Sequence, residues 1–179
     1  MHSYRTKGQP LPIPVTSGQY ATLPVGRYPA TLDEVYETFV KNAPFRPRRE
    51  LIFRALTLYI DLVSAEFSTS RYWIDGGFVT HKTWEEPEDA DVLVVVPPGE
   101  HGKVMTPEFL PHWTLLQTQP AQPRVYADKV HPMGGLLDCF ILPDAPQVLS
   151  VWDIRWSSVR DQQHNVVPDA RKGYLEVSA

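Results

Sequence analysis

The chain has 179 residues and the composition of a single globular domain, with 42% hydrophobic and 21% charged residues. Its formal net charge of -4 at pH 7 argues against a general nucleic-acid-binding protein, because such proteins are usually basic. Cys139 is the single cysteine, which excludes an intrachain disulfide framework, and no apolar stretch approaches the ~20 residues that span a bilayer. We therefore expect a cytoplasmic protein with no membrane partner.

The first 29 residues are rich in proline and predict an extended arm. The prolines stand too close together for a helix, at Pro10, Pro12, Pro14, Pro24 and Pro29. Such an arm either wraps around the domain or is partly disordered. We expect the folded domain to span residues 30–179.

Two helices are predicted after the arm. Thr31 and Glu34 form a capping-box pattern, which predicts a helix from Leu32 to about Asn42. From Arg48 to Phe67, apolar residues recur at steps of three and four, the clearest helical period in the chain. We expect this second helix to lie across a sheet.

The rest of the chain predicts strands with one helix between them. A threonine cap followed by Pro107 predicts a helix from Thr106 to Leu116. The segment 151–159 is compatible with either a helix or a strand. Strands are expected at residues 71–75, 91–96, 124–127, 136–142 and 173–177. This order predicts an α+β fold (α/β-like), in which a mixed sheet of about four or five strands packs against helices.

Two aspartates, one residue apart, open the valine-rich strand. Because strand residues alternate faces, Asp89 and Asp91 should point the same way. Two carboxylates at that separation repel each other unless positive charge lies between them. Mg²⁺ is the natural candidate, since it usually binds one or two carboxylates plus substrate phosphates. The alternative is a solvated start of a strand.

A glycine pair, Gly76 and Gly77, ends the strand before the aspartates. Glycines let backbone N–H groups approach a phosphate, although an ordinary turn would also explain the pair. His81 and Lys82 follow at positions where phosphate ligands could lie, and an exposed loop accounts for them about as well. These residues are therefore candidates for phosphate binding.

Asp138 supplies a third acidic candidate, because it lies within an apolar strand where an unpaired charge is expensive. If its strand pairs beside the strand of Asp91, three carboxylates could converge on one face. Metal-dependent nucleotidyl transfer needs such an arrangement. In that case Asp138 would hold a second ion or accept the proton of the attacking hydroxyl.

The glycine pair, the eleven residues 78–88 and the Asp89-Ala90-Asp91 motif together resemble the signature of the polymerase-β-like nucleotidyltransferase superfamily. Asp138 matches the third acidic position of that superfamily. More narrowly, segments 26–35, 77–80 and 172–174 make the chain similar to small bacterial and phage proteins of this type, some linked with toxin–antitoxin and phage-defence systems. The likeness spans most of residues 26–177.

This resemblance implies a nucleotidyltransferase-like fold and an enzyme that moves a nucleoside monophosphate from an NTP to a hydroxyl on RNA such as tRNA, on a protein or on a small molecule. Mg²⁺ or Mn²⁺ would be the cofactor, and a cognate toxin or antitoxin a possible partner. The implied catalytic and metal-binding residues are Asp89, Asp91 and Asp138, and the implied nucleotide-binding residues are Gly76, Gly77 and Lys82. The alternative is an inactive fold kept as an antitoxin-like or regulatory binding partner. A sugar transferase ranks last, because the glycine pair has no role there.

Two features depart from the superfamily pattern. Many relatives have serine at the second position of the pair, where this chain has Gly77. The spacer is also acidic, with Glu85, Glu86 and Glu88 preceding Asp89, so that a triphosphate would be repelled unless metal and Lys82 offset the charge.

Overall fold

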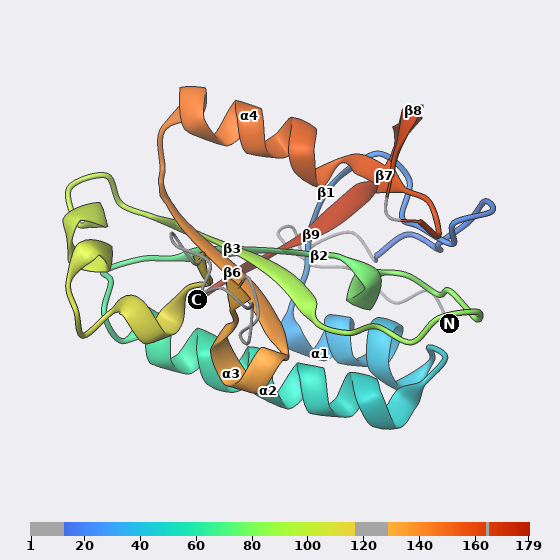
Figure 1. Cartoon of the computed structure of the whole chain (residues 1–179), viewed down its shortest axis with the longest axis horizontal. Coiled ribbons are helices and arrows are strands. Elements are labelled where there is room, and N and C mark those ends of the chain that lie inside the picture. The colour runs from blue at the N-terminus through green and yellow to red at the C-terminus, as the bar shows by residue number, and fades with distance from the viewer. Residues whose placement is uncertain (1–12, 117–128, 164) are drawn as a thin grey trace, which may run out of the picture.

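The structure is a computed structural model that describes residues 13–116, 129–163 and 165–179 (Figure 1). Its helical segments are α1 (Leu32–Tyr36), the π-helical turn η1 (Glu37–Lys41), α2 (Arg46–Ser64), the 3₁₀ turns η2 (Gly77–Val79), η3 (His101–Met105) and η4 (Leu110–His112), α3 (Pro132–Gly135) and α4 (Pro146–Trp156). Its strands are β1 (Gly26–Pro29), β2 (Arg71–Asp75), β3 (Ala90–Val96), β4 (Leu115–Leu116), β5 (Lys129–Val130), β6 (Leu137–Pro143), β7 (Ser158–Arg160), β8 (Val166–Arg171) and β9 (Gly173–Ser178).

A five-stranded mixed sheet in the order β1-β9-β2-β3-β6 forms the centre of the molecule. Strand β2 runs antiparallel to both of its neighbours, whereas β1 pairs with β9, and β3 with β6, in parallel. Two-stranded sheets β4-β5 and β7-β8 lie beside it. These elements confirm the predicted α+β class with a mixed sheet.

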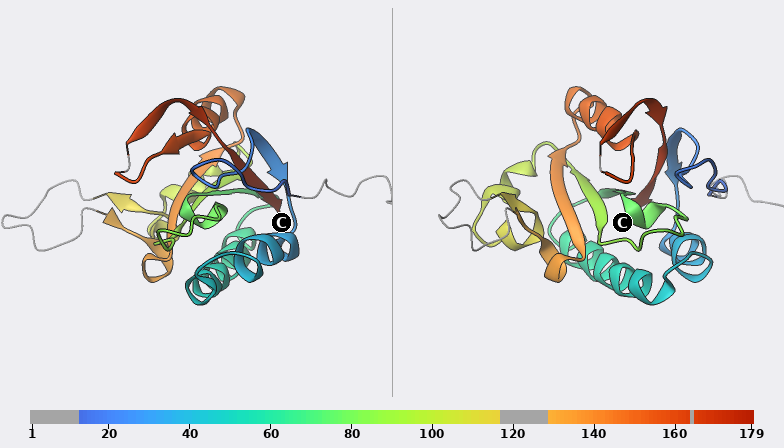
Figure 2. Two further views of the ribbon diagram at one scale, coloured as in Figure 1. Left: turned by 90° about the vertical axis from the view of Figure 1, so that its right-hand side faces the viewer. Right: turned by 45° about the vertical axis from the view of Figure 1, so that its right-hand side comes forward.

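Helices cover both faces of the sheet (Figure 1, Figure 2). On one face, Ile52, Leu56 and Tyr59 of α2 are fully buried in a cluster that includes Val92 and Val94 of β3. On the other face, α4 packs through Trp156 against a second cluster that includes Leu93. Because both faces are covered, residues 92–96 of β3 are a continuous apolar run rather than an alternating pattern.

The predicted helices at the start of the domain are confirmed. Thr31 Oγ1 accepts from the Glu34 N–H at 3.2 Å, and Glu34 Oε2 accepts from the Thr31 N–H at 2.8 Å. These two reciprocal hydrogen bonds form the capping box at the N-terminus of α1. Helix α2 occupies most of the segment 48–67, in which the helical period was clearest.

The predicted helix from Thr106 to Leu116 is wrong. The structure has a bend after η3, the short turn η4 and strand β4 there instead. Pro111 explains the difference, because proline lacks the N–H that an interior helical position must donate and its ring crowds the carbonyl four residues earlier. Only a proline in the first turn favours a helix, and Pro111 would lie in the second.

The remaining predicted strands divide into three cases. Strands β2, β3, β6 and β9 match their predicted positions within one residue. The ambiguous segment 151–159 holds both structures, the end of α4 and the start of β7. The strand predicted at 124–127 lies outside the described residues.

Strand β1, from the proline-rich segment, pairs with β9 at the edge of the sheet. None of the described helices combines the length and apolarity that a membrane crossing needs.

Arg49 is a fully buried cation that ties α2 to the turn after β2. Its guanidinium donates to the carbonyl oxygens of Phe78 at 2.6 Å, Thr80 at 2.8 Å and Phe39 at 3.0 Å. Burial lowers the Arg49 pKa to about 10, which leaves the side chain charged at neutral pH. Arg49 therefore holds the chain just after the glycine pair in place.

We predict that Arg49→Met destabilises the fold by about 3–5 kcal/mol, because it leaves several buried carbonyl oxygens without their donor. Urea denaturation followed by circular dichroism measures the change. Arg46→Met is the matched control, since Arg46 is exposed and its ion pair with Glu50, at 2.8 Å, lies on the surface of the same helix. Equal shifts of the unfolding midpoint in the two variants would contradict the structural role of Arg49.

Candidate functional site

Three aspartates form a row across β2, β3 and β6 at one end of the sheet. Asp75 of β2 stands opposite Asp91 of β3, and Asp91 stands opposite Asp138 of β6. Residues in register on neighbouring strands project from the same face, with Cβ atoms about 4.5–5.5 Å apart. The row therefore lies on the face that α4 covers, since Leu93 of β3 belongs to the cluster on that side.

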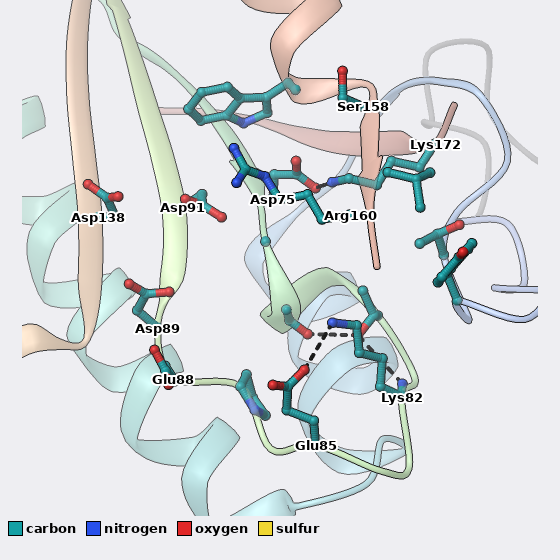
Figure 3. Close-up of a pocket in the computed structure, with 18 of the residues that line it drawn as sticks. Asp75, Lys82, Glu85, Glu88, Asp89, Asp91, Asp138, Ser158, Arg160 and Lys172 are labelled. Atoms are coloured by element: carbon teal, nitrogen blue, oxygen red, sulfur yellow. Dashed lines mark hydrogen bonds and ion pairs between the residues drawn. The ribbon is translucent and has the colours of Figure 1, made fainter. Parts of the chain in front are cut away.

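Asp89 adjoins this row just before β3 begins, so that four carboxylates gather at one end of the sheet (Figure 3). Of the four, Asp75 and Asp138 are buried, and Asp89 and Asp91 are half-buried. We call Asp75, Asp89, Asp91 and Asp138 the carboxylate cluster.

The carboxylate cluster lines a cleft of about 460 Å³. One wall is the acidic loop after the glycine pair, with Lys82 and Glu85. The other wall comes from α4, β7 and the residue before β9, and Figure 3 shows Arg160 and Lys172 on this side. An acidic group of side chains thus faces a wall that carries cations.

Burial, with a smaller contribution from neighbouring carboxylates, raises the pKa of two members of the cluster. Burial raises the pKa of Asp89 to about 6, and the neighbouring Asp91 and Asp138 add to the effect. His131 opposes it, because its Nδ1 lies 3.9 Å from Asp89 Oδ2. Burial likewise raises the pKa of Asp75 to about 6, although its ion pair with Lys172 favours the charged form. Ionised Asp89 and Asp75 therefore cost free energy in the folded state, mainly because they are withdrawn from water.

Gly76 is required by the geometry of the cluster. Its φ of +81° with ψ of -162° is a conformation that is essentially restricted to glycine. A Cβ built on Gly76 would also collide with the Asp91 carboxylate. At Gly77, by contrast, a Cβ would meet Pro87 at an ordinary 3.6 Å. The first glycine of the pair lets the backbone pass beside Asp91, whereas the second site has room for a side chain such as serine.

The acidic loop between the glycine pair and β3 is held against the start of α2. Arg48 donates to the carbonyl oxygens of Pro87, at 3.1 Å, and of Glu88. Lys82 forms an ion pair with Glu85 at 3.3 Å, so that its charge is partly used within its own loop. Two cations thus offset the acidity that the sequence shows in this segment.

All six residues that the sequence predicts for the site line this one cleft: Gly76, Gly77, Lys82, Asp89, Asp91 and Asp138. Asp75, Lys172 and Arg160 also line the cleft and are not among the predicted site residues. The position of Asp75, next to the glycine pair, was the available signal. Its membership of the row depends on strand register, which the sequence alone does not show.

The donor set of the cluster suits a hard divalent cation, because every member offers carboxylate oxygens. Within the described ranges, no three His, Cys, Asp or Glu side chains stand in an arrangement that could hold a metal ion. A Mg²⁺ site commonly needs only one or two carboxylates, with substrate phosphates completing the coordination. The carboxylates of the cluster therefore suit Mg²⁺ by ligand type. A site in which three protein side chains hold one ion is absent from the described residues.

The fold and the cleft define an α+β protein with a carboxylate cluster at the end of a mixed sheet. The chain belongs to the family of unknown function DUF6932, which matches residues 16–178. No curated protein and no solved structure matches the chain significantly. The matched range contains β1, the carboxylate cluster and Lys172.

We predict that Asp89→Asn stabilises the protein at pH 7 by about 1–2 kcal/mol, a value discounted for the 27% exposure of the side chain. A carboxyl whose pKa is raised to about 6 holds its proton more tightly in the folded state than in the unfolded state. The ionised group therefore costs stability above pH 6, and this cost disappears as the pH falls toward 4. Urea denaturation at both pH values should show the gain at pH 7 and none at pH 4; an equal gain at both would contradict the argument.

We predict opposite outcomes for the two glycines. Gly76→Ala should lower the free energy of unfolding by more than about 2 kcal/mol, because it adds backbone strain and a contact with Asp91. Gly77→Ser should change it by less than about 1 kcal/mol, because a Cβ there meets Pro87 at an ordinary van der Waals distance of 3.6 Å. Thermal denaturation of the two variants compares them directly, and a Gly76→Ala protein as stable as Gly77→Ser would show that the close approach to Asp91 is not constraining.

Proposed function

We propose that this protein is a metal-dependent nucleotidyltransferase, which transfers a nucleoside monophosphate from an NTP to a hydroxyl acceptor. The observation that carries the proposal is the register of β2, β3 and β6, which gathers Asp91 and Asp138 on one face with Asp89 beside them. The glycine turn at the end of β2 lies against the same carboxylates. This is the combination that the resemblance to polymerase-β-like nucleotidyltransferases leads us to look for.

In this proposal Asp89 and Asp91 would hold Mg²⁺ or Mn²⁺ together with the triphosphate, and Asp138 would hold a second ion or accept the proton of the attacking hydroxyl. The ion would neutralise charge on the phosphates and make the phosphorus more open to attack by the hydroxyl. The protein's own contribution is to hold the three carboxylates close to one another. A bound cation would offset the cost of burying the ionised Asp89, because burial together with the neighbouring carboxylates raises its pKa.

The cleft also suits a nucleotide in size. Its volume of about 460 Å³ falls in the usual range for small-molecule sites. The backbone between β2 and η2 would approach the phosphates without a side chain at Gly76. Arg49 contributes by holding the carbonyl oxygens of Phe78 and Thr80, which keeps this turn rigid before a ligand arrives.

The acceptor in this proposal is a hydroxyl on RNA such as tRNA, on a protein or on a small molecule. A cognate toxin or antitoxin remains part of the hypothesis as a partner. The half-exposed Asp91 and Asp89 mark the open side of the cluster, from which an acceptor of any of these sizes would enter.

We predict that the purified protein binds NTP in the presence of Mg²⁺ or Mn²⁺ and releases pyrophosphate. Asp89→Ala and Asp91→Ala should each reduce pyrophosphate release by at least about a hundredfold, because each removes a carboxylate that would hold the ion. Calorimetry of NTP binding in the presence of Mg²⁺ or Mn²⁺ and a coupled pyrophosphate assay, each over the four common NTPs, measure the two steps. EDTA should abolish release in the wild type.

Asp61→Ala, which removes an exposed aspartate of α2, is the matched control and should match the wild type in both measurements. If the wild type and both cluster variants bind NTP with Mg²⁺ equally well, the nucleotidyltransferase proposal fails. A partner that co-purifies with the wild type and with both cluster variants would then favour the alternative of an inactive fold that acts in binding.

A further inference from the structure

Lys172 is a buried lysine at the edge of the carboxylate cluster. It immediately precedes β9, is 9% exposed and lines the cleft. Its ammonium donates to Asp75 Oδ1, across a sequence separation of 97 residues (Figure 3). Lysine is almost never fully buried unless it is paired, so this position needs an explanation.

The backbone around Lys172 is held from three directions. The Lys172 N–H donates to the Ser157 carbonyl oxygen at 2.9 Å, and the Gly173 N–H donates to the Leu23 carbonyl oxygen at 3.0 Å. A Cβ built on Gly173 would collide with the Pro24 carbonyl oxygen. The start of β9 is thus packed between the chain before β1 and the end of α4, which fixes where the Lys172 side chain begins.

The ion pair with Asp75 leaves Lys172 with donors for a ligand. An ammonium group has three N–H donors, and within the described part of the chain Lys172 has Asp75 as its hydrogen-bond acceptor. Lys82, on the opposite wall, differs in two respects, since it is less buried and its partner Glu85 belongs to the same loop. Lys172 is placed by long-range contacts, whereas Lys82 is placed by local ones.

We propose that Lys172 is a phosphate-binding residue of this cleft, which contacts an anionic phosphate of the nucleotide while it stays paired with Asp75. This inference rests on the proposed function. A complex of Mg²⁺ with a nucleoside triphosphate is still anionic, and the carboxylate cluster would repel it unless a cation lies on the same side. In this assignment Asp75 is a positioning residue, which aims the lysine at the ligand and binds no ion itself.

The test uses the opposite effects that the positive charge of Lys172 should have on the affinities for a metal ion and for a phosphate: it weakens the first and strengthens the second. Lys172→Met should bind Mn²⁺ alone about threefold more tightly than the wild type, because it removes positive charge beside the carboxylates. It should bind inorganic tripolyphosphate with Mg²⁺, and NTP with Mg²⁺, at least about tenfold more weakly. Calorimetry on the full-length chain measures all three affinities. Lys41→Met is the control, since Lys41 is exposed on η1 and pairs with Glu37 at 2.9 Å.

Lys172→Met alone leaves the buried Asp75 carboxylate without its cation, which can lower the stability of the fold. The double variant Asp75→Asn with Lys172→Met removes both charges. It should bind Mn²⁺ within about threefold of the wild type and still lose at least about tenfold in tripolyphosphate affinity.

Each outcome decides between the possibilities. A parallel loss of Mn²⁺ and tripolyphosphate binding in the folded double variant would show a structural role for Lys172 and overturn the inference. A double variant that binds tripolyphosphate as tightly as the wild type would also overturn it. In both cases wild-type binding of NTP with Mg²⁺ would leave the proposed function standing. Failure of the wild type to bind Mn²⁺ and NTP would overturn both.

Discussion

The pairing register of three neighbouring strands is the constraint on which the cleft depends. Asp75, Asp91 and Asp138 share one face because β2, β3 and β6 are aligned at those residues. A shift of β3 by one residue would turn Asp91 toward the α2 side and bring Val92 under α4, which would exchange the two cores as well as scatter the carboxylates. The apolar packing on both faces therefore also holds the charged residues together.

The sequence predicted the elements whose signals are local. The helical period of α2, the capping box at Thr31 and the apolar run of β3 each depend on a few adjacent residues. The row that includes Asp75 could not be predicted, because it depends on which strands are neighbours and on how they align. The prediction of a helix from Thr106 was wrong for a local reason. The cap at Thr106 and Pro107 in the first turn favour a helix, but Pro111 in the second turn prevents it.

The carboxylate cluster and the stability of the fold make opposing demands. Burial and mutual repulsion raise the pKa of Asp89 and Asp75 to about 6, so that their charges are maintained at neutral pH against a free-energy cost. Arg49, two long-range hydrogen bonds at the start of β9 and the glycine at position 76 hold the backbone around these charges. Groups whose pKa values are shifted by burial in a cleft cluster at functional sites in proteins generally.

The distance along the chain between Asp75 and Lys172 has a consequence for how the molecule folds. The two residues are 97 positions apart, and β9 lies between β1 and β2 in the sheet although it follows the other strands in the chain. Contacts of such separation close large loops and form slowly. When β2 and β3 pair before β9 docks, Asp75 and Asp91 come together before Lys172 is in place. Divalent ions in the refolding buffer should therefore speed the pairing of β2 with β3, because they screen the repulsion between these carboxylates.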